Sequence, residues 1–265
     1  NVVMSDLIVD GNEATVTAGG GIYAAQNSSI TLDGVTISNN TTNNGQGGGL
    51  FVYTNSDASL SNVIISNNHG SAGGGIAVGS QSSISLSLVE ITGNSADTEG
   101  GGFHSWDSEA NLSFNHVTIA NNVAQGYGGG GMHIHRGPNV DIKNSNIANN
   151  APDQIYFDNE ESLNIVCSAT FEHNNIQGNQ DSIIIAYSEL TTINWGSGNI
   201  DVDPMFVDTA NGNYHLLASS QLINAGHPDS TDSDGTRADI GAYPYLNSYS
   251  GPTWYVQTDG SDTDG

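Results

Sequence analysis

The chain has 265 residues, of which 34 are glycine, and its 3 Lys and Arg against 28 Asp and Glu give a formal net charge of −25. This shortage of basic residues excludes a nucleic-acid-binding protein and attraction to anionic membranes, because phosphate groups are held by Lys and Arg. Only 12% of the residues are charged, and low charge with many turn residues and short apolar runs favours an all-β protein over a disordered one.

Two motifs recur through residues 1–190 at a spacing of roughly 28 residues. In the first motif an apolar residue and a spacer precede Asn-Asn or Gly-Asn, and the closing residues are Asn12, Asn40, Asn68, Asn94, Asn122, Asn150 and Asn179. The second motif is Gly-Gly-Gly followed by an apolar residue, which is Ile22, Leu50, Ile76, Phe103 or Met132. Two independent motifs with one period indicate a repeat protein in which each unit stacks on the next.

Each unit contains three short segments with alternating polarity, as a half-buried strand requires. In the first complete unit these segments are residues 22–25, 30–32 and 35–37. Turns rich in Gly, Asn and Ser join them, so we expect three strands per coil of a triangular solenoid. Apolar columns then run through the stack at Leu32, Leu60, Leu86, Phe114 and Ile142, at Ile37, Ile65, Ile91, Ile119 and Ile147, and at Val35, Val63, Val89 and Val117.

Both motifs are interpreted as corners of the coil. Asn tolerates the left-handed backbone of a tight turn, and its amide can bond the Asn stacked above it. The glycine triplets indicate a second corner with close backbone packing and positive φ. Cys167, the single cysteine, lies in the apolar run 163–167 and is expected to be a buried small hydrophobe.

The paired motifs resemble the right-handed parallel β-helix proteins of the pectin-lyase-like superfamily. They are similar in particular to repeats of chlamydial polymorphic outer-membrane proteins and of large secreted bacterial surface proteins. The resemblance implies the fold and a secreted, cell-surface location. It implies no single activity, because the superfamily holds lyases, hydrolases, epimerases, adhesins and phage spikes.

The segments that follow resemble the C-terminal closing region of secreted β-helix proteins with variable anchors. They are residues 198–208, 213–216, 222–226 and 234–243. We expect residues 191–246 to cover the open last coil, since an uncovered strand edge invites aggregation. Residues 247–265 are interpreted as a linker and the opening strand of a following repeat or a neighbouring subunit.

Aromatic, His and Arg side chains gather at outward positions of the first strand of each coil. The columns are Tyr23, Phe51, Ala77, His104 and His133; Ala25, Tyr53, Gly79, Trp106 and His135; and Gln26, Thr54, Ser80, Asp107 and Arg136. The candidate site therefore comprises Tyr53, His104, Trp106, Asp107, His133, His135 and Arg136. It could bind sugar through aromatic stacking and hydrogen bonds, bind a transition metal through its imidazoles, or be a packing or assembly surface.

An enzyme would need a complete catalytic set, and the sequence does not show one. The coils carry no pattern of paired Asp in adjacent coils, and Asp107 with His104 or His135 is the best remaining acid–base pair. Calcium is a further candidate ligand for the acidic loop that contains Asp229, Asp232 and Asp234, because it prefers hard oxygen ligands. Acidic loops are also common as plain solvated turns.

The sequence therefore predicts an all-β right-handed parallel β-helix, with three strands per coil and an irregular C-terminal cap. We expect a non-catalytic structural or adhesive module of a large secreted surface or filament protein. Its expected partners are copies of itself or tandem β-helix domains, assembled head to tail, and polysaccharide. The alternative is a polysaccharide-active enzyme, either a pectate-lyase-like lyase or a glycoside hydrolase, that uses the His/Trp/Asp/Arg face.

Overall fold

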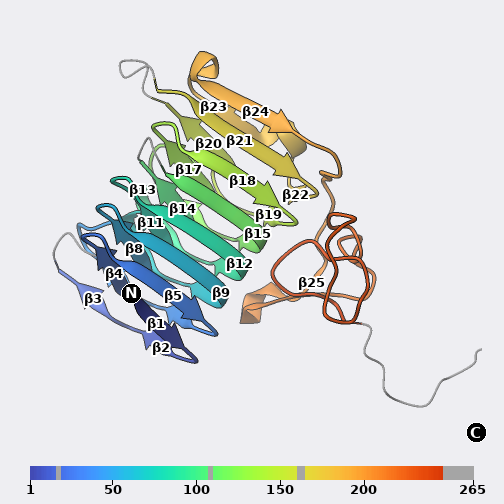
Figure 1. The fold of residues 1–265 in the computed structure, drawn as a ribbon, viewed down its shortest axis with the longest axis horizontal. Coiled ribbons are helices and arrows are strands. Elements are labelled where there is room, and N and C mark those ends of the chain that lie inside the picture. Colours follow the sequence, from blue (N-terminus) through green and yellow to red (C-terminus); the bar gives the residue numbers. More distant parts are fainter. Residues whose placement is uncertain (16–18, 107–109, 160–164, 247–265) are drawn as a thin grey trace, which may run out of the picture.

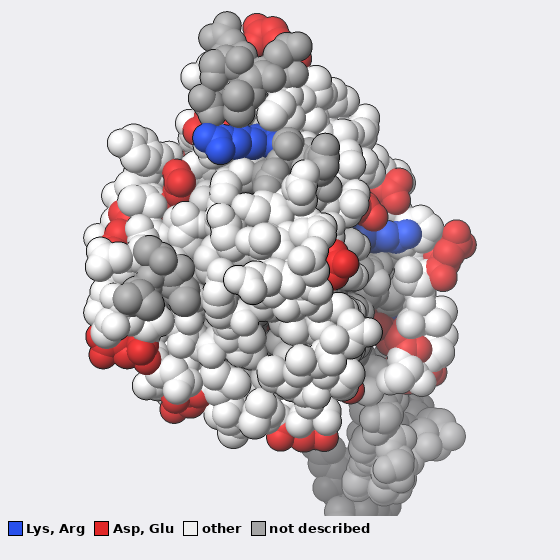
Figure 2. Space-filling view, turned by 60° about the vertical axis from the view of Figure 1, so that its left-hand side comes forward, with Lys and Arg blue, Asp and Glu red and all other residues white. Residues whose placement is uncertain are grey.

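The computed structural model describes residues 1–15, 19–106, 110–159 and 165–246, and the chain winds as a parallel β-solenoid (Figure 1). Within these ranges the structure has no helix with the length and apolar character that a membrane span requires. Acidic residues lie mainly along the margin of the face shown in Figure 2, and the middle of that face is largely uncharged.

Three parallel sheets run along the solenoid, and we name them sheets A, B and C. Sheet A contains β1 (Val2–Ser5), β2 (Ile8–Asp10), β5 (Ser29–Asp33), β6 (Thr36–Ser38), β9 (Asp57–Ser66), β12 (Ser83–Thr92), β15 (Asn111–Ala120), β18 (Asn139–Lys143), β19 (Asn146–Ala148), β21 (Cys167–Glu172), β22 (Asn175–Ile176) and β24 (Thr191–Trp195). Sheet B contains β3 (Glu13–Ala14), β7 (Thr41–Thr42), β10 (His69–Ala72), β13 (Ser95–Glu99) and β16 (Val123–Ala124). Sheet C contains β4 (Ile22–Ala25), β8 (Leu50–Tyr53), β11 (Ile76–Val78), β14 (Phe103–Ser105), β17 (Met132–His135), β20 (Ile155–Asp158) and β23 (Ile183–Ile185).

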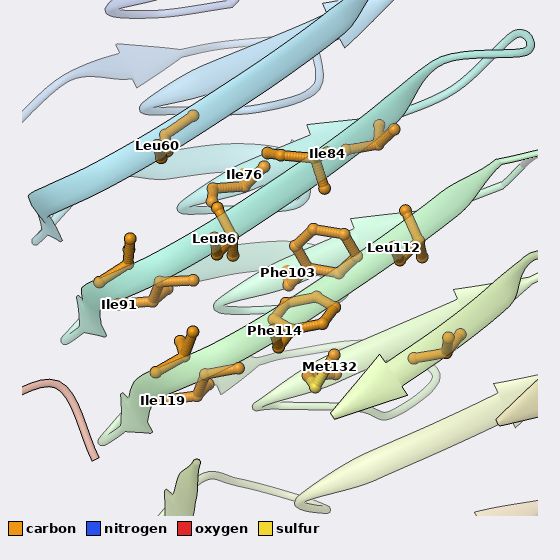
Figure 3. Close-up of a cluster of buried hydrophobic side chains, with 14 of the residues drawn as sticks. Leu60, Ile76, Ile84, Leu86, Ile91, Phe103, Leu112, Phe114, Ile119 and Met132 are labelled. Carbon is orange, nitrogen blue, oxygen red and sulfur yellow. The ribbon is translucent and has the colours of Figure 1, made fainter. Parts of the chain in front are cut away.

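The predicted apolar columns are confirmed by the strand register. Leu60 pairs with Leu86 and Leu86 with Phe114, and all three side chains are buried. Figure 3 shows these side chains packed between the sheets with Ile76 and Phe103 of sheet C. One continuous apolar core therefore runs along the solenoid axis, as each coil stacks on its neighbours.

The division of each coil into strands differs from the prediction. The second and third predicted segments both belong to sheet A, where a left-handed residue bends the strand; Leu88 has φ of 56° and His116 also has 56°. The third sheet, sheet B, follows the Asn corner instead. Its strands are short and carry few apolar side chains, for example His69–Ala72. The alternating apolar pattern that indicates a strand is therefore missing there.

The two residues of the Asn corner have different roles. The first adopts the left-handed conformation, as at Asn67 (φ 55°) and Gly93 (φ 63°), which explains why Asn and Gly alternate there. The second is a buried Asn whose Nδ2 donates to the Oδ1 of the Asn in the next coil, at 3.0 Å from Asn68 to Asn94 and from Asn94 to Asn122. The predicted ladder is confirmed, and it extends from Asn12 to Asn150.

Each glycine triplet packs against this ladder. The first glycine has positive φ in most coils, for example 63° at Gly73, which confirms the prediction. The middle glycine allows the closest approach of backbones, because a Cβ on Gly74 would overlap the carbonyl of Ser95. The third glycine lies against the ladder amide, with Gly75 beside Asn94.

The C-terminal region differs from the expectation that it covers the open last coil. Strand β24 still extends sheet A by pairing with β21. The chain then forms β25 (Phe206–Asp208) and β26 (Asn213–Leu216), and folds back beside the earlier coils (Figure 1). Three short 3-10 turns complete the described elements, at Asn179–Ser182, Ser188–Leu190 and Thr209–Asn211.

Hydrogen bonds attach this region to the flank of sheet A. Asn121 Nδ2 donates to the Tyr214 hydroxyl at 2.8 Å, and the Ala242 amide donates to Thr118 Oγ1 at 3.0 Å. Glu90 is buried beneath the C-terminal region, and its carboxylate accepts a hydrogen bond from the Thr92 hydroxyl. The region therefore protects a flank of polar side chains, which no strand pattern could predict. The proposed opening strand in residues 247–265 lies outside the described residues.

Candidate functional site

The candidate site lies on the outer face of sheet C, where the predicted columns are in register. His104 pairs with His133, and His133 pairs in turn with Tyr156 of β20. Parallel strands in register place such side chains about 5 Å apart along the solenoid. The sequence prediction of a shared face is therefore confirmed for His104 and His133.

The aromatic side chains on this face form a connected row. Phe51 is central to it: its ring centroid lies 5.2 Å from Tyr23, 5.1 Å from Tyr53 and 5.5 Å from Trp106. Trp106 also stacks on His104 at 5.4 Å with an interplanar angle of 25°. These separations are typical of favourable aromatic pairs.

Trp106 joins two parts of the row because its neighbour in the preceding coil, Gly79 directly after β11, has no side chain. A Cβ on Gly79 would overlap the Trp106 indole ring. The ring lies over that space and reaches Phe51 and Tyr53, whose centroid is 5.9 Å away. Position 79 must therefore be occupied by glycine for the Trp106 ring to adopt this position.

A pocket of about 280 Å³ opens beside these rings. The residues that line it are Tyr23, Asn44, Gly45, Gln46, Phe51, Tyr53 and Trp106. The side-chain oxygen of Gln46 is buried there and has no hydrogen-bond partner among the described residues. A buried acceptor without a donor costs free energy, so the pocket is suited to a ligand that donates a hydrogen bond.

Asn44 and Gln46 are site residues that the sequence prediction missed. Gln46 directly precedes a glycine triplet and is in register with Ala72 and Glu99 of the following coils, but the residue type changes from coil to coil at this position, so no repeated pattern indicated it. The segment after β7 joins Ala72 of sheet B through an isolated bridge from Gln46, and its residues Asn44, Gly45 and Gln46 line the pocket beside the rings of sheet C. Only the three-dimensional path of that segment places the amides beside Trp106.

His104 and His133 were predicted at outward positions of this face, but both are buried. His104 is 2% exposed and His133 is 0% exposed. Glu99, from the end of β13, lies between them, with Oε1 3.5 Å from His104 Nε2 and Oε2 3.6 Å from His133 Nδ1. Asp158 lies 4.0 Å from His133 Nε2.

Burial shifts the pKa values of this cluster. It holds the pKa of His104 well below its usual value and lowers the pKa of His133 to about 4, with the neighbouring histidines adding to both shifts. Burial also raises the pKa of Glu99, and the nearby Asp158 carboxylate adds to this. Near neutral pH both buried imidazoles are therefore neutral.

We expect His133 to make folding stability depend on pH. Its folded-state pKa of about 4 lies below the reference 6.5, so the unfolded chain binds more protons as the pH falls. The contribution of neutral His133 to the free energy of unfolding is fully present above about pH 6.5. It decreases as the pH falls to 4, and the total loss is about 3 kcal/mol. Urea unfolding of wild type and His133→Gln at neutral and acidic pH measures this. Equal pH dependence of the two proteins would contradict the prediction.

The remaining predicted site residues lie at the edge of this face. His135 is partly buried, 6.2 Å from His133 between ring centroids. Arg136 occupies the corner after β17 with φ of 61°, so it does not lie on the strand face. Asp107 lies outside the described residues. The sequence prediction missed Tyr156 and Asp158 because no glycine triplet precedes β20. It missed Glu99 because this residue lies directly before a glycine triplet, outside the predicted strand segments.

The acidic loop proposed for calcium forms an internally bonded turn. Asp234 Oδ1 accepts from the Thr236 amide and hydroxyl, and Asp232 Oδ2 accepts from the Asp239 amide. Burial, with Asp239 nearby, raises the pKa of Asp232 to about 6. In the described parts of the chain, which include Asp229, His104, His133 and His135, there is no group of three or more His, Cys, Asp or Glu placed to hold a metal ion.

Cys167 is buried, and its thiol donates to the Pro138 carbonyl at 3.2 Å. Burial raises the pKa of the thiol to about 12, which makes the reactive thiolate scarce. Its role as a small core residue is confirmed.

Comparison with known proteins identifies the fold family. A family model described as "Right handed beta helix region" matches residues 3–94 and 49–200. No curated protein and no solved structure matches the chain.

Proposed function

Since the chain belongs to the right-handed β-helix family, we propose that it is a non-catalytic extracellular module that holds a polysaccharide chain against the outer face of sheet C. The module would serve as a structural or adhesive part of a larger secreted, surface-associated protein. Aromatic rings ordered by stacked strands, beside amide side chains, are the feature that supports this proposal.

The pocket beside Trp106 is the observation that carries the proposal. Its lining combines four aromatic rings with the amides of Asn44 and Gln46. Sugar rings present C–H faces that pack on aromatic rings, and their hydroxyls both donate and accept hydrogen bonds. A hydroxyl donated to the buried Gln46 oxygen would satisfy an acceptor that has no partner in the described structure.

Binding without catalysis agrees with the lining chemistry. The pocket residues carry amide, phenol, phenyl and indole groups, and none of the seven is a carboxylate or an imidazole. Acid–base catalysis needs a proton donor and acceptor within hydrogen-bond reach of the substrate. A lyase or hydrolase remains the alternative outcome, and release of unsaturated or reducing sugar ends would reveal it.

We expect Trp106→Ala and Gly79→Ala each to weaken glycan binding at least about tenfold, because buried aromatic anchors carry much of the binding free energy. Gly79→Ala keeps the indole and only displaces it, since the added Cβ would overlap the ring. A glycan array followed by calorimetry with the best glycan measures both effects.

Ser59→Ala, on the exposed outer face of sheet A, is the matched control and should bind like wild type. Absence of any glycan binding by wild type would overturn the proposal, as would unchanged affinity of the Trp106 variant. Association with copies of itself or with tandem β-helix domains stays a separate prediction. Electron microscopy of the purified protein tests it, and non-associating monomers would contradict it.

A further inference from the structure

We propose that the glycan held on sheet C carries protonated amino groups, and that Glu99 and Asp158 bind them next to the aromatic pocket. This inference rests on the proposed glycan binding and names the class of sugar. A polymer of amino sugars with free amines has this chemistry. Fully acetylated, uncharged and uronic-acid polymers do not.

Glu99 is a carboxylate whose charge is poorly compensated. Its side chain is 26% exposed, and no hydrogen bond reaches its carboxylate in the described part of the chain. The neighbouring charge that acts on it is a second carboxylate, Asp158, whose side chain is 33% exposed. Two partly buried carboxylates that face solvent attract a cation.

The two imidazoles beneath these carboxylates also lack hydrogen-bond partners of good geometry. Both ring nitrogens of His104 and both of His133 are buried without a hydrogen bond of good geometry to a described residue. Two of these nitrogens face Glu99 at 3.5 and 3.6 Å, which is too long for a hydrogen bond. Each neutral imidazole offers one donor and one acceptor nitrogen, whereas an ammonium group has three donors and no acceptor. An ammonium group would therefore suit the carboxylates and the acceptor nitrogens of this cluster.

Aromatic faces complete the site for a cation. The Tyr156 ring lies 5.1 Å from His133. Burial raises the pKa of the Tyr156 hydroxyl, and the nearby carboxylates of Asp158 and Asp153 add to this. On the other side, Trp106 stacks on His104. Indole and phenol faces attract ammonium groups. The cluster therefore has both aromatic faces and carboxylates at its edges.

The acidic cluster is continuous with the aromatic pocket, and this continuity favours a sugar over other cations. Trp106 lines the pocket on one side and stacks on His104 on the other, and His104 lies beside Glu99. One chain running along the face would therefore meet aromatic rings and then carboxylates. Anionic polysaccharides would be repelled by Glu99 and Asp158 and by the net charge of −25.

Calorimetry with three sets of β-linked oligosaccharides of equal length tests the inference, at slightly acidic pH and fixed ionic strength. The probes are glucosamine, N-acetylglucosamine and glucose oligomers. We expect the glucosamine oligomer to bind wild type at least about tenfold more tightly than the other two, as charge-assisted hydrogen bonds are the stronger ones. Glu99→Gln should reduce this preference to less than about threefold.

Asp57→Asn removes the same charge at the exposed start of β9 on sheet A, outside the residues that line the pocket, and should keep the full preference. Trp106→Ala should weaken all three oligomers. If neutral oligomers bind as tightly as the glucosamine oligomer, this inference is overturned and the proposed function stands. If no oligomer binds, both fall. An oligolysine that binds as tightly as the glucosamine oligomer would show a general cation site and would also overturn the inference.

Discussion

A Gly74→Ala variant is expected to lose about 3 kcal/mol or more of its unfolding free energy, or to fail to fold. The substitution adds one methyl group, but the Cβ would overlap the carbonyl of Ser95 and lie in close contact with the carbonyl of Gly101 in the next coil. Both neighbours are backbone atoms, so relief requires the coils to separate. Separation would also weaken the hydrogen bonds from Gly74 to Gly100 and from Gly75 to Gly101.

Gly212→Ala is the control for this prediction. Gly212 has φ of 74°, and a Cβ there would have nothing within 4 Å. Its cost should be the conformational one alone, about 1 kcal/mol. Urea unfolding followed by circular dichroism compares the two variants. Equal losses of unfolding free energy in the two variants would contradict the prediction, because they would show that the glycine corner has room for a Cβ at position 74.

An Asn94→Ala variant is expected to lose about 4 kcal/mol of unfolding free energy. Asn94 is 1% exposed, and its side chain makes four hydrogen bonds. It donates to the Ile65 carbonyl and to Asn122 Oδ1, and it accepts from the amide and Nδ2 of Asn68. Alanine leaves these buried groups without partners, which costs more than the loss of the bonds alone.

Asn67→Gly, at the adjacent residue, is the matched control. Asn67 is exposed, and its φ of 55° is a conformation that glycine adopts freely. We therefore expect a change of less than about 1 kcal/mol. Chemical denaturation of both variants measures the difference. A small effect at Asn94 would show that the ladder contributes little to stability and is replaced by solvent.

The repeating parts of the fold could be predicted because stacked coils repeat one environment. Leu32, Leu60 and Leu86 share a column, so one apolar pattern repeated at one period gave the core. The same reasoning gave the Asn ladder, since each Asn bonds its counterpart one coil away. Sheet B was missed because its strands follow the corner with few apolar residues.

The non-repeating parts could be predicted much less well. The register gave His104 and His133, but it did not indicate Glu99, which lies between them at a position that holds Gln46 and Ala72 in the preceding coils. Gln46 reaches the pocket through the path of a connecting segment, and the C-terminal region lies on a flank through contacts such as Asn121 with Tyr214. Contacts between residues at unrelated positions of the repeat leave no periodic signal.

The indole N–H signals of the tryptophans in a protein NMR spectrum test the proposed binding face most directly. Trp106 lies in the pocket on sheet C, and Trp195 lies at the last strand of sheet A, packed against the core. Upon titration with the oligosaccharide that binds best, we expect the Trp106 signal to move saturably while the Trp195 signal stays in place. A stationary Trp106 signal at saturating oligosaccharide would contradict binding on this face.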